Sequence, residues 1–237
     1  MIKSWNCEEP MPQLTWLGHG CWLIKTSKQT ALLDPFLDPS PTAPYKAAEI
    51  KDIDVILVSH GHFDHVADLV SIAKPTKAVV VSNFEICEWV GNQGVNSTEP
   101  MNLGGSIPLP LGRVTLTPAV HSSVLPDGTY GGNPGGFLVE ADGKKIYFAC
   151  DTALTVDMRL LARHKIDLAV LPIGDRYTMG PDDSLEAIRM IEPRRVAPAH
   201  YNTWPPIAQD AKAWAERVRS ETKAEPMVLE PGGVIHL

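Results

Sequence analysis

The sequence of 237 residues lacks the features that mark nucleic-acid-binding, membrane-spanning and secreted proteins. Its 21 lysine and arginine residues are outnumbered by 28 aspartate and glutamate residues, and the formal net charge of -7 lacks the basic excess that attracts a nucleic-acid backbone. No apolar run approaches the ~18 residues of a membrane span. Residues 1–13 are charged and contain two prolines where a signal peptide would be apolar. We therefore expect no nucleic-acid partner, no membrane span and no secretion.

Cysteine is also scarce, and its four copies show no Cys-x-x-Cys spacing. With 44% hydrophobic residues, a chain of this length can bury a large core without disulfides. We expect Cys7, Cys21, Cys87 and Cys150 to be free thiols and the protein to be cytoplasmic. A homo-oligomer is compatible with the sequence.

What the sequence does contain is a dense group of metal-binding side chains at residues 59–65, SHGHFDH. The group follows the apolar run at 55–58, which is typical of a short buried strand. Because side chains two apart on an extended segment point the same way, His60 and His62 can bind one ion together. Asp64 and His65 lie where the chain turns away and can reach a second ion. Imidazole and carboxylate are ligands that zinc accepts, so a dinuclear metal site is predicted.

The segment His60-Gly61-His62-Phe63-Asp64-His65 is similar to the His-x-His-x-Asp-His signature of the metallo-β-lactamase superfamily. This resemblance implies further ligands downstream at strand ends, and histidine or aspartate follows three strand-like segments. The ligand set that the resemblance implies has seven members: His60, His62 and His121 for a first ion, Asp64, His65 and His200 for a second, and Asp151 bridging both.

Residues 1–237 are expected to form a single metallo-β-lactamase-like domain, since candidate ligands between positions 60 and 200 must converge. The resemblance implies an α/β fold, a four-layer αββα sandwich of two mixed β-sheets with helices on the outer faces. The chain order agrees, because short turn-separated strands alternate with strand-helix units. Expected helices cover 66–73, 83–90 with Asn83 as cap, 154–164, a segment opened by a capping box at 183–186 and about 207–220, with closing strands near 228–229 and 234–235.

A narrower resemblance covers nearly the whole chain. The segments at 18–20 (GHG), 33–36 (LDPF), 173–181 (IGDRYTMGP) and 200–205 (HYNTWP) look like those of uncharacterised prokaryotic metal-dependent hydrolases related to L-ascorbate-6-phosphate lactonase. One departure is visible, because the family's Gly-Asp-Thr around the bridging aspartate reads Cys150-Asp151-Thr152 here. On a continuous strand Cys150 faces away from Asp151 and packs in the interior. A kink there would instead bring the thiol near the metals as a ligand.

Several further residues are candidates for the site, each with a plainer alternative. His19 lies at the pocket rim or orients a ligand from behind it, unless it is only a turn residue. Asp34 either orients a metal-binding histidine or caps a turn. The candidates for the substrate pocket are loop residues that could equally be core packing: Asp175, Tyr177, Tyr201 and Trp204.

The predicted function is hydrolysis of a small ester or lactone by a hydroxide that bridges two divalent ions. Zinc is the default ion for this ligand set, and manganese, nickel or iron would fit the same side chains. Metal binding lowers the pKa of water from about 16 to about 7, so no serine or cysteine nucleophile is needed. Asp64, Asp151 and His19 are the candidate catalytic residues for handling protons and positioning the reactants. Two ions, two carboxylates and a hydroxide leave about +1, which favours a small anionic substrate.

Three alternatives stay open. A phosphodiesterase of the phospholipase-D type would use the same ions on a phosphoryl oxygen. An iron-dependent oxidoreductase can be built on the same fold, although its flavodiiron version usually has glutamate at the place of His62. A metal-stabilised binding protein without turnover is the third.

Overall fold

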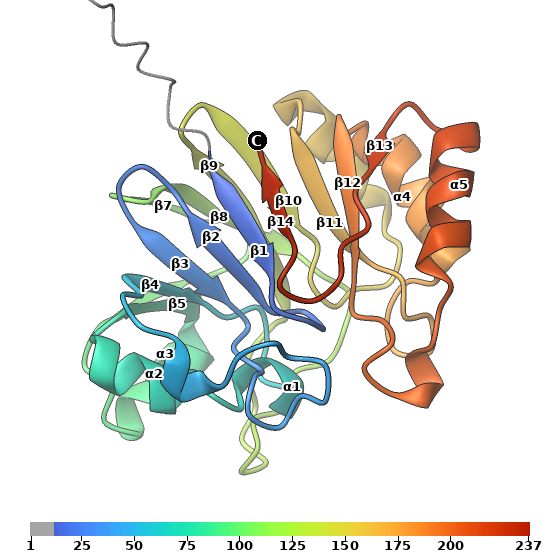
Figure 1. Ribbon diagram of the computed structural model, residues 1–237. Coiled ribbons are helices and arrows are strands. Elements are labelled where there is room, and N and C mark those ends of the chain that lie inside the picture. The colour runs from blue at the N-terminus through green and yellow to red at the C-terminus, as the bar shows by residue number, and fades with distance from the viewer. Residues whose placement is uncertain (1–11) are drawn as a thin grey trace, which may run out of the picture.

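The computed structural model describes residues 12–237. Cys7 lies outside the described residues. So do residues 1–11 of the segment 1–13, in which no signal peptide was expected. Two seven-stranded sheets face each other, and helices lie on their outer sides (Figure 1). The predicted sandwich of two mixed sheets with outer helices is confirmed. In the described part of the chain, no helix is both long and apolar enough to cross a membrane.

The first sheet has the strand order β14-β1-β2-β3-β4-β5-β6. Its β14, β1, β2 and β3 pair antiparallel, whereas β3 to β6 pair parallel. The strand bounds are β1 Gln13–Trp16, β2 Trp22–Lys25, β3 Thr30–Leu33, β4 Val55–Leu57, β5 Val79–Asn83, β6 Thr98–Met101 and β14 Val234–His236.

The second sheet has the order β13-β12-β11-β10-β9-β8-β7. Here β7 to β10 pair antiparallel, and β10 to β13 pair parallel. The strand bounds are β7 Ser106–Leu109, β8 Gly112–Pro118, β9 Gly135–Ala141, β10 Lys144–Phe148, β11 Leu168–Pro172, β12 Arg195–Ala199 and β13 Glu225–Pro226.

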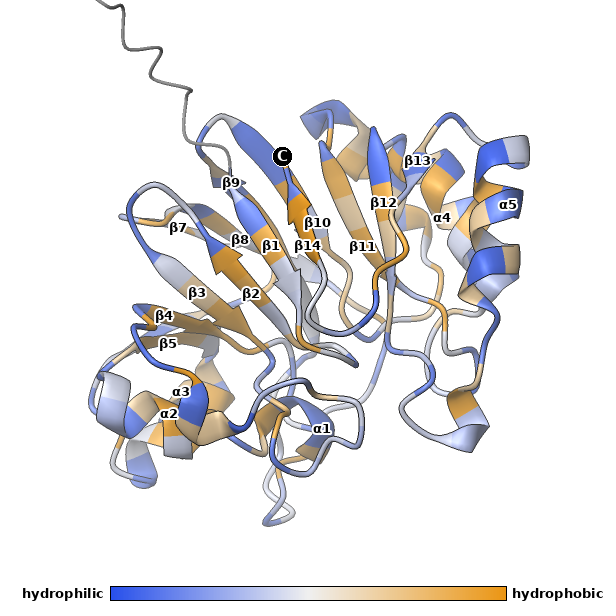
Figure 2. Cartoon of the chain, viewed as in Figure 1, coloured by the Kyte–Doolittle hydropathy of each residue, from blue (hydrophilic) through white to orange (hydrophobic). Residues whose placement is uncertain are grey.

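The main core lies between the two sheets. Leu14 and Trp16 of β1 alternate inward and pack with residues of the second sheet such as Phe137 and Phe148. A second apolar cluster, including Ile56 and Ile72, packs the first sheet against the helices on its outer face. Hydrophobic residues are accordingly concentrated in the strands, and the outward face of α5 is hydrophilic (Figure 2).

The helices and 3-10 turns fill the connections. Their bounds are η1 Ala47–Glu49, α1 Phe63–Val66, α2 Leu69–Thr76, α3 Phe84–Asn92, η2 Val156–His164, α4 Pro181–Ile191, η3 Pro205–Ile207 and α5 Ala211–Glu221. Asn83 caps α3 as expected, since its side chain accepts a hydrogen bond from the Ile86 N–H.

Five of the predicted elements differ from the structure. The helix expected over 66–73 is broken at Asp68, whose carboxylate accepts hydrogen bonds from the backbone N–H groups of Leu37 and Asp38. Residues 156–164 form a 3-10 helix. The capping box at 183–186 does not open α4, because Pro181 occupies the first helical position and Gly180 precedes it. Helix α5 begins only after its cap Asp210, and 228–229 is not a strand.

The candidate ligands lie just after the ends of four strands, and these strand ends lie near one another. The motif at 59–65 follows β4, and His121, Asp151 and His200 follow β8, β10 and β12. Left-handed backbone, which costs energy in residues other than glycine, occurs at Cys150 (φ 52°) and His200 (φ 54°). The sheets therefore bring the predicted ligands together from segments far apart in the sequence.

Candidate metal centre

Three of the predicted ligands form a first group. His60 Nε2 lies 3.0 Å from His62 Nδ1, and His121 Nε2 lies 3.3 Å from the same Nδ1 atom. His60 is fully buried, whereas His62 and His121 are partly exposed. The first group is therefore closed on the side of the protein interior and open towards solvent.

A second group surrounds Asp64. Its Oδ2 atom lies 3.9 Å from His65 Nε2 and 3.8 Å from His200 Nε2. His19 Nε2 lies closer, at 3.0 Å. The predicted grouping of Asp64, His65 and His200 is thus present in space, with His19 added to it.

Asp151 lies between the two groups. Its Oδ2 atom is 3.9 Å from His60 Nε2 and 3.6 Å from His121 Nε2 on one side. On the other side it is 3.4 Å from His65 Nε2 and 3.0 Å from His200 Nε2. One carboxylate oxygen therefore faces histidines of both groups.

The spacing of the candidate donor atoms suits bound metal ions better than it suits direct hydrogen bonds between the side chains. Ligand atoms of a tetrahedral zinc site are about 3.3 Å apart for bonds near 2.0 Å, and the contacts around His62 Nδ1 match that spacing. The Nε2 atoms of His65 and His200 are buried without a hydrogen-bond partner among residues 12–237, although both lie near Asp151. When these nitrogens are deprotonated, their lone pairs converge on shared points, an arrangement that suits a cation.

Asp34 fixes the orientation of two of these histidines. Its Oδ2 atom lies 2.8 Å from His65 Nδ1 and accepts a 2.6 Å hydrogen bond from the Ser59 hydroxyl. Because that hydroxyl donates to Asp34, its oxygen accepts from His60 Nδ1 at 2.9 Å. The protons then sit on Nδ1, and the Nε2 atoms face the cluster free to bind metal. The expected contact between Asp34 and one of the candidate ligand histidines is present.

His19 is fully buried, so its expected place at the pocket rim was wrong. Burial and the nearby His200 lower its pKa to about 4, which keeps the ring neutral. Its Nε2–H donates to the Asp64 carboxylate, and its Nδ1 accepts from the Thr203 hydroxyl at 2.7 Å. The other expectation, that His19 orients a ligand, agrees with this geometry.

The four expected pocket residues separate into different places. The Trp204 ring lies 5.1 Å from the His19 ring and is partly exposed, at the edge of the cluster. Asp175 and Tyr177 are exposed on the loop after β11, and none of their contacts within residues 12–237 reaches the histidines.

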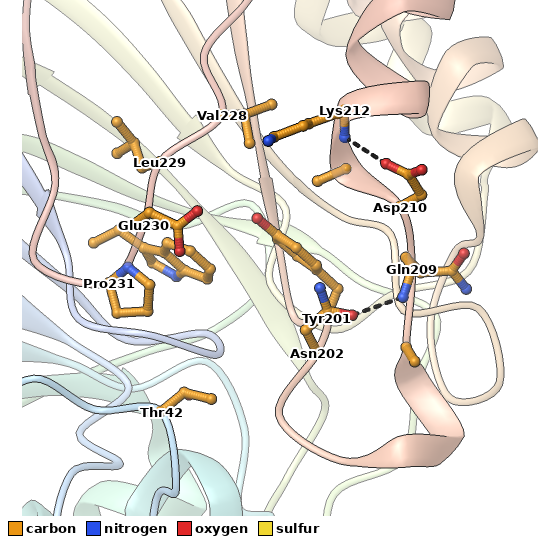
Figure 3. Close-up of a pocket in the computed structure, with 13 residues that line it drawn as sticks. Thr42, Tyr201, Asn202, Gln209, Asp210, Lys212, Val228, Leu229, Glu230 and Pro231 are labelled. Atoms are coloured by element: carbon orange, nitrogen blue, oxygen red, sulfur yellow. Dashed lines mark hydrogen bonds between the residues drawn. The ribbon is translucent and has the colours of Figure 1, made fainter.

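The Tyr201 side chain packs away from the cluster. Its ring stacks on Trp16, with ring centres 5.4 Å apart and an angle of 15° between the planes. It lines a separate cavity (Figure 3). Burial and the Glu230 carboxylate raise the pKa of Tyr201 to about 12.

Comparison with known proteins agrees with this geometry. Residues 29–201 match the family model of the beta-lactamase superfamily domain. A UPF0173 metal-dependent hydrolase from Thermus thermophilus is 47% identical over 227 residues, which cover 96% of this chain and 100% of that protein. The chain belongs to the UPF0173 metal-dependent hydrolase family. A second member, from Pelotomaculum thermopropionicum, is 45% identical over 95% of this chain and 100% of its own length.

A solved structure is similar to this UPF0173 hydrolase in fold as well as in sequence. Igni18, a metallo hydrolase from the archaeon Ignicoccus hospitalis, is 31% identical and superimposes with a TM-score of 0.86. The match covers 96% of this chain and 98% of Igni18. The superfamily expected from the motif at 59–65 is confirmed.

The carboxylates of the UPF0173 site remain ionised despite their burial. Burial alone would raise the pKa of Asp151, but His200 and His65 hold it well below its usual range. The reverse holds for the histidines: burial would lower the pKa of His200, yet Asp151 raises it to about 9. The pKa of His65 is also raised, chiefly by Asp151 and Asp34 acting against burial. Without metal, His200 is protonated and positively charged at pH 7, and the raised pKa of His65 favours its charged form as well.

This protonation predicts that zinc binding to metal-free protein releases protons and tightens as the pH rises from 7 towards 9. The same raised pKa of His200 stabilises the metal-free fold below its unfolded value of 6.5, and that contribution is lost as the pH approaches 9. Calorimetric titration with zinc in two buffers of different ionisation enthalpy measures the release. Equal heats in the two buffers would contradict it.

Cys150 neither continues the strand nor joins the metal-binding groups. Strand β10 ends at Phe148, and the left-handed backbone at Cys150 provides the kink considered above. The thiol nevertheless points back toward the Phe148 carbonyl, 3.8 Å away, and belongs to none of the candidate ligand sets in residues 12–237. The three described cysteines are free, as expected.

Sequence reasoning missed two supporting hydroxyls. Ser59 directly precedes the motif and joins Asp34 to His60. Thr203 lies three residues after His200 and contacts His19. Their position beside ligand residues was the available signal, because such partners commonly fix the ring orientation of metal-binding histidines.

Proposed function

We propose that this UPF0173 protein hydrolyses a small, anionic ester or lactone with two divalent ions, zinc by default. The observation that carries the proposal is the position of Asp151 Oδ2 between His60 and His121 on one side and His65 and His200 on the other. A carboxylate in that place suits a bridge between two ions. We assign the first ion to His60, His62 and His121 and the second to Asp64, His65 and His200.

Bound ions would supply Lewis acidity and make hydroxide available near neutral pH, since a metal lowers the pKa of water from about 16 to about 7. The chain's own residues hold the arrangement. His19 keeps a hydrogen bond on Asp64, and Asp34 keeps His65 turned towards the cluster. Asp64 and Asp151 stay ionised and are the candidate groups for accepting a proton during turnover.

Substrate would approach from the side of the partly exposed histidines. His62 lies there with Ser122, whose hydroxyl is 3.3 Å from His62 Nε2. Phe63 is 53% exposed and Trp204 is 36% exposed, and both rings pack 5.8 Å from Phe36. These two side chains provide apolar surface at the edge of the cluster, whereas the ions would favour an anionic group at its centre.

The choice of ester or lactone rests on the resemblance of four segments to relatives of L-ascorbate-6-phosphate lactonase, including 173–181 and 200–205. The phosphodiesterase alternative uses the same cluster, and iron in place of zinc would favour the oxidoreductase alternative. Measured substrate preference and metal content distinguish the three.

A hydrolysis panel is the test. We expect wild-type protein loaded with zinc to cleave lactones and carboxylic esters, and His62→Ala protein to lose at least about a hundredfold of that rate. His236→Ala, which removes an exposed histidine outside the cluster, serves as the matched control and should keep the wild-type rate. Cleavage of phosphodiesters alone would reject the proposed substrate class and leave the metal site standing.

A further inference from the structure

A cavity of about 650 Å³ is lined by none of the seven side chains of the candidate metal cluster. Its walls are the segment 201–212, which runs from the end of β12 into α5, and the segment 228–231 (Figure 3). Trp16 and Thr42 also line the cavity, which is open to solvent. This volume lies within the range of about 300–1,000 Å³ that is usual for small-molecule sites.

The hydroxyl of Tyr201 points into this cavity. Tyr201 is only 6% exposed, and its hydroxyl is directed into the cavity (Figure 3). Among residues 12–237 that hydroxyl forms no hydrogen bond, and solvent reaches it through the cavity. A neutral phenol in this position can donate one hydrogen bond to a ligand. Its ring is held in place by the stack on Trp16.

Two opposite charges lie on facing walls of the cavity. The Lys212 ammonium enters from α5, and the Glu230 carboxylate enters from the segment 228–231 (Figure 3). Within the described residues these two groups form no ion pair with each other or with another side chain. Asp210 is already engaged, since its carboxylate accepts from the backbone N–H groups of Lys212 and Ala213.

The rest of the lining is mainly apolar. Ala211, Val228, Leu229 and Pro231 cover the wall beside the charged groups. A ligand that satisfies the lining therefore needs an acceptor, a positive group and a small apolar part. A simple inorganic anion would leave the Glu230 carboxylate facing it, which disfavours binding.

We propose that this cavity binds a small zwitterion, of the kind represented by an amino acid with an apolar side chain. The ligand's carboxylate accepts from the Lys212 ammonium and the Tyr201 hydroxyl, and its ammonium group pairs with Glu230. The apolar side chain packs against Val228 and Leu229. The site is separate from the proposed catalytic cluster.

The experiment is a calorimetric titration of the full chain with L-leucine and with two analogues that each lack one charge, isocaproate and isopentylamine. We expect leucine to bind with a Kd below about 10 mM and each analogue to bind at least about tenfold more weakly. No heat of binding from leucine over that range would overturn the proposal. Isocaproate binding as tightly as leucine would also overturn it, since Glu230 would then have no role.

Three variants locate the binding. Lys212→Met, Glu230→Gln and Tyr201→Phe should each weaken leucine binding, the first two by at least about tenfold. Tyr201→Phe keeps the ring stacked on Trp16 and removes only the hydroxyl. Lys28→Met, which removes an exposed lysine outside the cavity, is the control and should bind as wild type. Unchanged affinity in both Lys212→Met and Glu230→Gln would place leucine elsewhere and overturn the assignment.

Discussion

Asp151→Asn protein is expected to lose about a thousandfold or more of kcat/KM toward its lactone or ester substrate. The reason is electrostatic as well as geometric, because Asp151 Oδ2 is the one oxygen that faces histidines of both groups. An amide of equal size cannot supply the negative charge that balances two divalent ions, and it presents a single oxygen to them. Steady-state kinetics with zinc-loaded protein measures the loss.

The matched control for this substitution is Asp157→Asn. Asp157 is an exposed carboxylate at the start of η2, outside the candidate metal-binding groups. It should leave the rate unchanged. An Asp151→Asn protein that is folded, zinc-loaded and within about tenfold of the wild-type rate would remove Asp151 from the catalytic account.

The second large effect concerns the number of ions. His62→Ala should empty the first group and leave one ion with Asp64, His65 and His200, whereas His200→Ala should empty the second group. Each ion would have three ligands of its own and would share Asp151, so the loss of one histidine is expected to weaken binding of that ion enough for dialysis to remove it. Both variants are expected to hold about one ion per chain and to lose most of their activity.

Metal analysis by mass spectrometry after dialysis, with circular dichroism to verify the fold, measures this prediction. His236→Ala again serves as the control, because His236 is exposed and lies outside the cluster. Two ions in either variant would contradict the assignment of separate groups. Loss of the fold in His62→Ala would instead favour the binding-protein alternative.

The first half of the site could be predicted from local sequence because its ligands are neighbours. Residues 60–65 follow a buried strand directly, so spacing alone places His60 and His62 on one side of the chain. His121, Asp151 and His200 follow strands of the second sheet and are far from this motif in the sequence. Only a resemblance could join them to it before the fold was known.

Two residues, His19 and Tyr201, lie in places that local sequence patterns did not predict. His19 is buried because the backbone N–H of His200 and the Trp16 indole both donate to its carbonyl, a contact across 181 residues in the case of His200. The left-handed backbone at His200 then turns Tyr201 onto Trp16 instead of towards the cluster. These are long-range packing effects, and no periodicity in the sequence reports them.

The predicted bounds of the helix at 66–73 were wrong for a related reason. At Asp68 the helix is interrupted by contacts with residues 35–38: the backbone N–H of Asp68 donates to the Pro35 carbonyl, and its carboxylate accepts from the backbone N–H groups of Leu37 and Asp38. By contrast, the two mixed sheets with outer helices, which the family resemblance implied and the strand-helix alternation fitted, are present in the structure.

The account is tested most directly by adding zinc stepwise to metal-free protein while following lactone hydrolysis. The rate should rise with added zinc and reach its plateau at two ions per chain, because Asp151 is assigned as the bridge between two occupied groups. A plateau at one ion would reject the dinuclear mechanism. A rate independent of zinc would reject the metal-dependent hydrolysis that the cluster is proposed to perform.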